Sequence, residues 1–242
     1  MQYMGSKNRY SKYIVPIIQN YINENTKGYI EPFVGGANII DKIDCKLKIG
    51  CDINEYLIAL LDYVSKGGEL HDTITEDEYN TVKNNKDSYD KWYVGLVGFT
   101  ATFGNKFFGG CARNKTKTTA DYSTTAINNL KKQAPNLKNI HFRNMSFKSI
   151  PKEKIKGYVI YCDPPYKGTT KYKTDPFPYE EYYDWCREMS KDNIVLCSEY
   201  WMFEDFECIW EKETTTQINS KRKANDDKNI RIEKLFRIGG NK

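Results

Sequence analysis

The sequence predicts an α/β protein built around a mainly parallel β-sheet of about seven strands, with an antiparallel strand at the end. Strand-like apolar runs alternate with helix-like segments along much of the chain, which is the order of a parallel sheet with helices on its faces. Two late apolar runs, "FECIW" and "IRIEKLFRI", flank a long polar stretch and predict a closing antiparallel hairpin.

The first part of the chain contains two strand–turn–helix units. Apolar residues at helical spacing predict a helix over residues 7–23 before the first unit. "GYIEPFVGGANII" then predicts a strand at Tyr29–Ile30, a turn at Gly35–Gly36 and a helix. "LKIGCDINEYLIALLDYV" predicts a strand over 47–51 and a helix that ends near Gly67.

Residues 68–136 interrupt this order and predict an inserted, mainly helical subdomain. An acidic helical segment comes first, and a stretch rich in Gly, Lys and Thr, "GNKFFGGCARNKTKTTADYSTT", comes later. Between them, aromatic and apolar residues at helical spacing predict one helix with an apolar face: Trp92, Leu96, Phe99, Phe103 and Phe107. The strands resume with "NIHF", "YVIYC" and "NIVLCSEY".

Positive charge is concentrated in one segment. The chain carries a net charge of +5, whereas residues 101–152 hold ten Lys or Arg and one acid, which gives 10 − 1 = +9. The remainder is therefore net acidic by four, since 5 − 9 = −4. A basic segment of this kind fits a polyanionic partner such as nucleic acid, and it equally fits a solvated loop; charge alone leaves both open.

Other features of the composition bound the class of protein. No stretch approaches the roughly 20 apolar residues that span a membrane. The segment "MQYMGSKNRY" lacks the apolar run of a signal peptide, so we expect a cytoplasmic protein. The seven cysteines are scattered without C-x-x-C spacing, which predicts reduced thiols and no metal site.

The glycine turn after the first strand predicts a cofactor site. Gly35 and Gly36 let a ligand approach the backbone, and Asp52, sixteen residues after Gly36, is placed to accept hydrogen bonds from ribose hydroxyls. The absence of G-x-G-x-x-G argues against NAD, and Ala37 excludes a P-loop. Glu31 would repel a pyrophosphate and attract a sulfonium, so S-adenosylmethionine fits. The alternative is an ordinary βα turn whose glycines serve packing alone.

"CDPPY", at the end of a predicted strand, predicts a rigid acceptor site for an amino group. The N6 of adenine is a poor nucleophile because its lone pair is delocalised into the ring. The Asp163 carboxylate and the Pro164 carbonyl can each accept one N6–H bond, and Pro164 and Pro165 hold both acceptors still. Tyr166 can stack on a base that has left the duplex. The alternative is a strand-ending turn without chemistry.

In order, "YMGSK", "EPFVGGAN", "CDIN", an insertion and "CDPPYKGT" resemble the Dam-like, D12-class DNA adenine-N6 methyltransferases, α-group in motif order. "VLCSEY" and "IEKLF" are similar to the family too. The resemblance implies a Rossmann-like class I methyltransferase sheet with an inserted helical DNA-recognition subdomain. It divides the chain into a catalytic domain that binds S-adenosylmethionine, residues 1–67 and 137–242, and a target-recognition insertion, residues 68–136.

The resemblance also implies roles for individual residues. Ser6 stands where the family often has glycine, and Ser146-Phe147 where it often has Asp-Phe, so Phe147 is expected against the cofactor's adenine without a neighbouring carboxylate. Lys7 is expected near the cofactor's carboxylate. Together with Glu31, the expected cofactor-binding set is Tyr3, Gly5, Lys7, Phe33, Gly35, Gly36, Asp52, Phe147 and Asp163.

The expected partner is double-stranded DNA, bound by a monomer. The glycines and cations of "FGNKFFGGCARNKTK" suit a loop that follows the DNA backbone, with Lys106 and Arg113 for phosphate or a guanine edge and Lys115 and Lys117 beside them. Two alternatives stay open. One is a methyltransferase-fold DNA-binding protein without catalysis, and the other is an N-methyltransferase that acts on RNA or protein.

Overall fold

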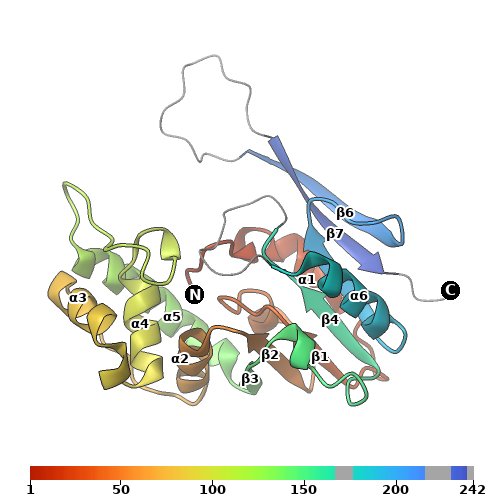
Figure 1. Ribbon diagram of the computed structural model, residues 1–242, viewed down its shortest axis with the longest axis horizontal. Helices are drawn as coiled ribbons and strands as arrows, with labels where there is room; N and C mark the ends of the chain where they lie inside the picture. Colours follow the sequence, from red (N-terminus) through yellow and green to blue (C-terminus); the bar gives the residue numbers. More distant parts are fainter. Residues whose placement is uncertain (167–176, 216–229, 239–242) are drawn as a thin grey trace.

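The computed structural model describes residues 1–166, 177–215 and 230–238, and in these residues it contains a seven-stranded mixed sheet (Figure 1). The strand order is β3-β2-β1-β4-β5-β7-β6, with β7 antiparallel to both neighbours. This confirms the predicted Rossmann-like α/β sheet with its antiparallel end. The strands are β1 (Gly28–Glu31), β2 (Lys48–Asp52), β3 (Ile140–Asn144), β4 (Tyr158–Cys162), β5 (Ile194–Glu199), β6 (Phe206–Thr215) and β7 (Ile230–Ile238).

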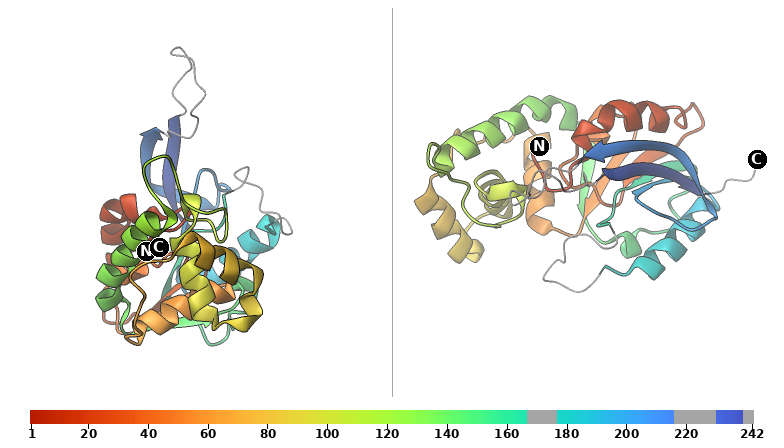
Figure 2. Two further views of the ribbon diagram at one scale, coloured as in Figure 1. Left: turned by 90° about the vertical axis from the view of Figure 1, so that its left-hand side faces the viewer. Right: turned by 90° about the horizontal axis from the view of Figure 1, so that it is seen from above.

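The helices form two groups. Those that accompany the sheet are α1 (Ser11–Gln19), α2 (Glu55–Ser65) and α6 (Tyr179–Ser190). A second group lies to one side of the sheet in Figure 1 and in the right-hand view of Figure 2, and consists of α3 (Glu76–Asn84), α4 (Lys91–Thr100) and α5 (Thr119–Leu137). Short 3₁₀ turns complete the set: η1 (Lys7–Arg9), η2 (Ile40–Lys42), η3 (Lys86–Ser88), η4 (Phe103–Asn105) and η5 (Phe147–Ser149). No described helix is both long and apolar enough to cross a membrane.

The core lies on both faces of the sheet because successive side chains of a strand point to opposite faces. Tyr29 and Tyr161 belong to a cluster on one face, and Ile30 and Ile160 to a cluster on the other. A parallel strand covered on both sides is apolar along its whole length, which explains the unbroken runs in the sequence.

The helix predicted after the glycine turn is absent. Only the 3₁₀ turn η2 follows, because Gly35 (φ +46°) and Ala37 (φ +56°) both take left-handed backbone conformations that a right-handed helix does not contain. The predicted helix over 7–23 is also shorter, since a 3₁₀ turn at Lys7–Arg9 precedes α1 and α1 ends at Gln19.

The aromatic helix predicted through Phe107 was wrong beyond Thr100. Left-handed residues follow at Gly104 (φ +67°) and Asn105 (φ +56°), so the chain turns back on itself. Phe107 packs against Phe99 with ring centroids 5.0 Å apart, whereas Phe103 is 70% exposed. The polar stretch between the last two strands lies, over 216–229, outside the described residues.

Close contact between α2 and α4 gives a test of this packing. A Cβ atom at Gly95 would lie 2.2 Å from the backbone oxygen of Tyr56, so any side chain there forces the two helices apart. We expect Gly95→Ala to lower the free energy of unfolding by about 2 kcal/mol, measured by urea denaturation. Asn128→Ala, at an exposed position of α5, is the control and should change it little. An unchanged midpoint for Gly95→Ala would contradict the packing.

Candidate active site

Three acidic residues meet at the carboxyl edge of the sheet. Strand β1 lies between β2 and β4 and is parallel to both, so Glu31, Asp52 and Asp163 end or follow neighbouring strands at one edge. The strand order reverses at β1, because β2 and β3 continue on one side and β4 and β5 on the other. Open α/β sheets bind ligands in the crevice at this point.

The glycine turn is held against the end of β2. The backbone N–H of Gly35 donates to Asp52 Oδ2 at 3.3 Å, and that of Asn54 donates to Oδ1 at 2.9 Å. Tyr3 lies over the turn, because a Cβ at Gly35 would be 3.0 Å from the Tyr3 ring and one at Gly36 would be 2.8 Å from Tyr3 Cβ. The structure therefore brings these four predicted cofactor residues together.

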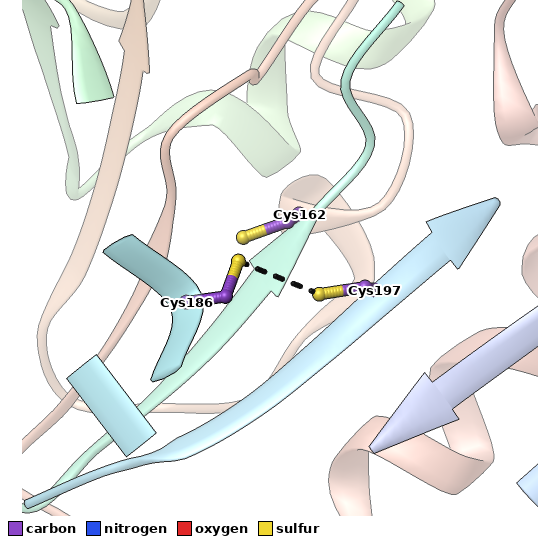
Figure 3. A group of neighbouring side chains, drawn as sticks. All are labelled: Cys162, Cys186 and Cys197. Atoms are coloured by element: carbon purple, nitrogen blue, oxygen red, sulfur yellow. Dashed lines mark hydrogen bonds between the residues drawn. The ribbon is translucent and has the colours of Figure 1, made fainter. Parts of the chain in front are cut away.

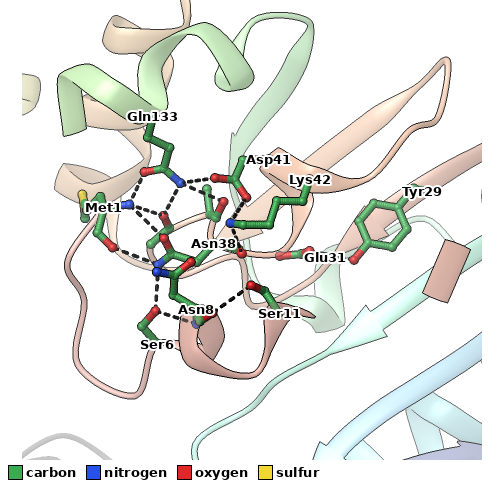
Figure 4. Close-up of polar contacts among 12 residues, drawn as sticks. Met1, Ser6, Asn8, Ser11, Tyr29, Glu31, Asn38, Asp41, Lys42 and Gln133 are labelled. Carbon is green, nitrogen blue, oxygen red and sulfur yellow. Dashed lines mark hydrogen bonds and ion pairs between the residues drawn. The ribbon is translucent and has the colours of Figure 1, made fainter. Parts of the chain in front are cut away.

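The turn is also fixed by residues that sequence analysis missed. Gln133 of α5 donates from Nε2 to the carbonyl oxygens of Gly36 (3.2 Å) and Ala37 (3.0 Å) (Figure 4). Asn38 donates from Nδ2 to the Met1 carbonyl at 2.9 Å. No local pattern marks Gln133, because it bonds to a turn nearly a hundred residues earlier in the chain.

Ile53 follows Asp52 directly and was also missed. The residue is 77% exposed, directly after the strand end that carries Asp52. The signal in the sequence was the isoleucine in "CDIN", where the strand has already ended.

A buried ammonium joins two carboxylates beside the Asp-Pro-Pro-Tyr turn. Lys7 Nζ lies 3.1 Å from Asp163 Oδ1 and 3.0 Å from Glu233 Oε1, and Lys7 is only 8% exposed. The Tyr166 hydroxyl donates to the same Glu233 oxygen, and Lys7 Nζ lies 4.1 Å from the centre of the Tyr166 ring. Lys7, Asp163 and Tyr166 were predicted and are in contact. Glu233 was missed; it is the acid of β7, a strand that also carries Arg231, Lys234 and Arg237.

These contacts set the charges in the site. Burial alone would lower the pKa of Lys7, but the Asp163 and Glu233 carboxylates outweigh it and raise the pKa. Burial raises the pKa of Asp163 to about 6, against the lowering effect of Lys7, and Glu233 adds to the rise. Burial likewise raises the pKa of Asp52 to about 6, against the hydrogen bonds from Asn54 and Gly35.

The acceptor turn is held from outside by α6. The Tyr179 hydroxyl donates to the Pro165 carbonyl at 3.0 Å. The rings of Tyr166 and Tyr200 pack edge to face, with their centroids 4.6 Å apart. Pro164 is buried. Because Lys7 covers one face of the Tyr166 ring, a base that stacked on this face would displace the ammonium.

The remaining predicted cofactor residues lie around the same edge. Phe33 and Phe147 pack with ring centroids 5.6 Å apart, and Phe147 is buried. Gly5 (φ +79°) forms the turn that precedes Lys7. Glu31 is buried and accepts from the Tyr29 hydroxyl at 2.7 Å (Figure 4). Burial raises the pKa of Glu31 well above its usual range, which favours its neutral form until a cation lies beside it.

The predicted DNA-contacting residues lie on the loop between α4 and α5. Lys106, Arg113, Lys115 and Lys117 are all exposed there. An isolated antiparallel β-bridge between the backbones of Thr102 and Cys111 closes the loop. Arg113 Nη1 forms an ion pair with Glu76 Oε1 at 2.5 Å. The other three are exposed lysines, so a polyanion can reach them.

Three thiols converge behind the acceptor turn, which their spacing did not indicate. The sulfur atoms of Cys162, Cys186 and Cys197 lie within 4.8 Å of one another, and all three residues are buried (Figure 3). Burial raises the pKa of Cys162 and Cys186 well above the usual range, which favours neutral thiols packed among apolar neighbours. The expected absence of a metal stays a prediction.

A known protein family matches the part of the chain that contains most of these site residues. The sequence model of the D12 class N6 adenine-specific DNA methyltransferase family matches residues 3–94 and 77–224, which together cover more than half of the chain. The matched span contains the glycine turn, Asp52 and the Asp-Pro-Pro-Tyr turn, whereas Glu233 lies beyond it. No curated protein matches the chain.

The raised carboxyl pKa values predict a pH dependence of stability. Asp52 and Asp163 have pKa values of about 6 in the folded protein against an ordinary 3.8, so the folded state binds more protons between about pH 4 and pH 6. Stability therefore falls as pH rises through this window. We expect Asp52→Asn and Asp163→Asn each to reduce that fall by about 1–3 kcal/mol in urea denaturation at pH 4, 5, 6 and 7. Parallel curves for mutants and wild type would contradict the assigned shifts.

Proposed function

The chain belongs to the D12 class N6 adenine-specific DNA methyltransferases, and on that premise we propose that it methylates a flipped adenine within a specific sequence of double-stranded DNA. Family membership makes it an enzyme that uses S-adenosylmethionine to methylate adenine N6 in DNA. Base flipping, sequence specificity, the α-group order and the role of each residue belong to the proposal. The order is supported by the glycine turn, the helical segment and the acceptor turn, which follow one another in the chain.

The observation that carries the proposal is the Asp163 carboxylate in a turn stiffened by Pro164 and Pro165 and held by Tyr179. We infer that the carboxylate and the Pro164 carbonyl each accept one N6–H bond. Fixed acceptors draw the N6 lone pair out of the ring system toward the methyl group, and they are aligned before the reaction begins. As the bond from N6 to the methyl carbon formed and the sulfur–methyl bond broke, Asp163 would stabilise the positive charge on N6, and the N6 proton would then pass to this carboxylate or to water.

The residues at this edge fit S-adenosylmethionine. Gly35, which lacks a side chain and is left-handed, lets the backbone of the turn pack directly against the Tyr3 ring. Asp52 can accept from a ribose, and the exposed Ile53 offers a face for an adenine ring. Bound there, the cofactor supplies an electrophilic methyl group on a cationic sulfur. We infer that Asp163 favours that cation and that the Lys7 ammonium, which pairs with Asp163 and Glu233, also attracts the carboxylate of the cofactor.

Recognition of DNA is proposed for the α4–α5 loop and the helices beside it. The four exposed cations of this loop supply contacts to phosphate or to base edges. Gln133 of α5 bonds directly to the glycine turn, and the Tyr3 ring packs against Phe99 of α4 at 5.7 Å between centroids. These contacts give the inserted segment a defined position relative to the cofactor residues.

Loss of the acceptor carboxylate tests the proposal. We expect Asp163→Ala to reduce methylation by about 10²–10³-fold, as removal of one preorganised hydrogen-bond partner does at an oxyanion hole. Wild type and variant are expressed in a bacterial host that lacks adenine methylation, and N6-methyladenine is mapped by sequencing. Asp192→Ala, which removes an exposed carboxylate paired with Lys156, is the control and should leave methylation intact. Full activity of Asp163→Ala would exclude the acceptor role, and a wild type that binds S-adenosylmethionine without modifying DNA would favour a binding protein.

Salt dependence tests the DNA-binding loop. We expect Lys115→Ala/Lys117→Ala to weaken binding to duplex DNA. The slope of log K against log [salt], which is negative, should become shallower by about 2, because each phosphate contact contributes about −0.9. Lys152→Ala/Lys154→Ala, two exposed lysines before β4, form the matched control and should keep the slope. A slope that changed equally in both variants would remove the loop from the interface.

A further inference from the structure

Buried ionisable side chains are concentrated at the carboxyl edge of the sheet. Among the described residues, the buried side chains of Lys, Arg, Asp and Glu are Lys7, Glu31, Glu199 and Glu233. Glu31 and Glu199 end β1 and β5, and Lys7 pairs with Asp163 beside β4. This edge of the sheet is therefore rich in carboxyl groups in a protein whose net charge is +5.

Glu233 has no part in the acceptor chemistry described above, yet it is 5% exposed and contacts two residues of the site. It comes from β7, the antiparallel strand next to β5. Its Oε1 atom accepts from the Tyr166 hydroxyl and lies 3.0 Å from Lys7 Nζ. An ionised side chain is expensive to bury, so a purely structural partner for Tyr166 did not need to be an acid.

The charges of the cluster do not cancel. Lys7 carries one positive charge, and Asp163 and Glu233 carry one negative charge each when ionised, so the sum is 1 − 2 = −1. Asp163 is needed as an acceptor, and Lys7 is shared between the two carboxylates. The excess negative charge therefore depends on Glu233. Charges in a buried site interact more strongly than charges in water, so this excess acts on any ligand that binds beside it.

We propose that Glu233 biases the cofactor pocket toward the cationic S-adenosylmethionine relative to its neutral thioether product, S-adenosylhomocysteine. This inference rests on the proposed function. The two ligands share the adenosine, the ammonium and the carboxylate, and they differ in the methyl group and the positive charge on sulfur. When the methyl group is transferred, the sulfur becomes a neutral thioether. The excess negative charge then no longer attracts the sulfur, which favours exchange of the product for fresh cofactor.

The experiment compares the dissociation constants of both ligands, without DNA, by isothermal titration calorimetry. Glu233→Gln keeps the size of the side chain and an oxygen that accepts from Tyr166, and removes the charge. We expect the ratio Kd(S-adenosylmethionine)/Kd(S-adenosylhomocysteine) to rise about tenfold, mainly through weaker binding of the cation.

Three further variants separate charge from shape. Tyr166→Phe removes the hydroxyl bonded to Glu233 and no formal charge, so the ratio should stay within about threefold of wild type. Glu233→Asp keeps the charge and should behave in the same way. Glu207→Gln removes an exposed carboxylate from β6 and should change neither constant.

Equal weakening of both ligands by Glu233→Gln would overturn the proposal, because that is the result of a structural role alone. If Glu233→Gln does not fold, Glu233→Asp decides: the wild-type ratio supports the proposal, and a tenfold shift overturns it. The assay contains no DNA, so its failure is separate from failure of the proposed function. A wild type that binds both ligands but never methylates adenine would refute the function and leave the charge bias to be judged by the ratio.

Discussion

The ion pairs of Lys7 hold together three segments that are distant in the chain. Its ammonium bridges Asp163, which follows β4, and Glu233, which comes from β7. Two carboxylates buried this close would repel each other without the ammonium, and the ammonium would lose its hydration without them. The acceptor turn, the first 3₁₀ turn and the antiparallel strand must therefore assemble as one unit. The placement of Tyr166 depends on the same unit, through its bond to Glu233 and its contact with Lys7.

Local pattern was sufficient for the strands and insufficient for the contacts between segments. Apolar runs located the described strands, most clearly β1 and β4, because parallel strands buried on both faces carry few polar residues. Lys7, Asp163 and Tyr166 could be found because they stand in short motifs. Glu233 could not, since its role depends on β7 lying beside β5, and pairing order is not written in the strand itself. The prediction of a helix after the glycine turn was wrong for a related reason, because Ala37 adopts a left-handed conformation that alanine does not favour.

The inserted helices contact the cofactor turn through side chains that no motif marks. Gln133 donates to the carbonyl oxygens of Gly36 and Ala37, and Tyr3 lies between the glycines and Phe99. Movement of α4 or α5 would have to break these contacts or carry the turn along. DNA bound at the α4–α5 loop and the cofactor bound at the turn would thus be linked by packing, with no change in the sheet required.

The separation of charge between loop and pocket favours a flipped base as the group that reaches Asp163. The α4–α5 loop, residues 101–118, carries four cations and no acid, whereas the carboxyl edge of the sheet gathers Glu31, Asp52, Asp163, Glu199 and Glu233. On the proposed function, a loop of this charge would attract phosphates and the carboxyl edge would repel them, which would hold the DNA backbone outside. The neutral base of a flipped adenine would be free to enter, with its N6–H groups toward Asp163. An adenine still paired in the duplex would bring both backbones close to these carboxylates, which would oppose its approach.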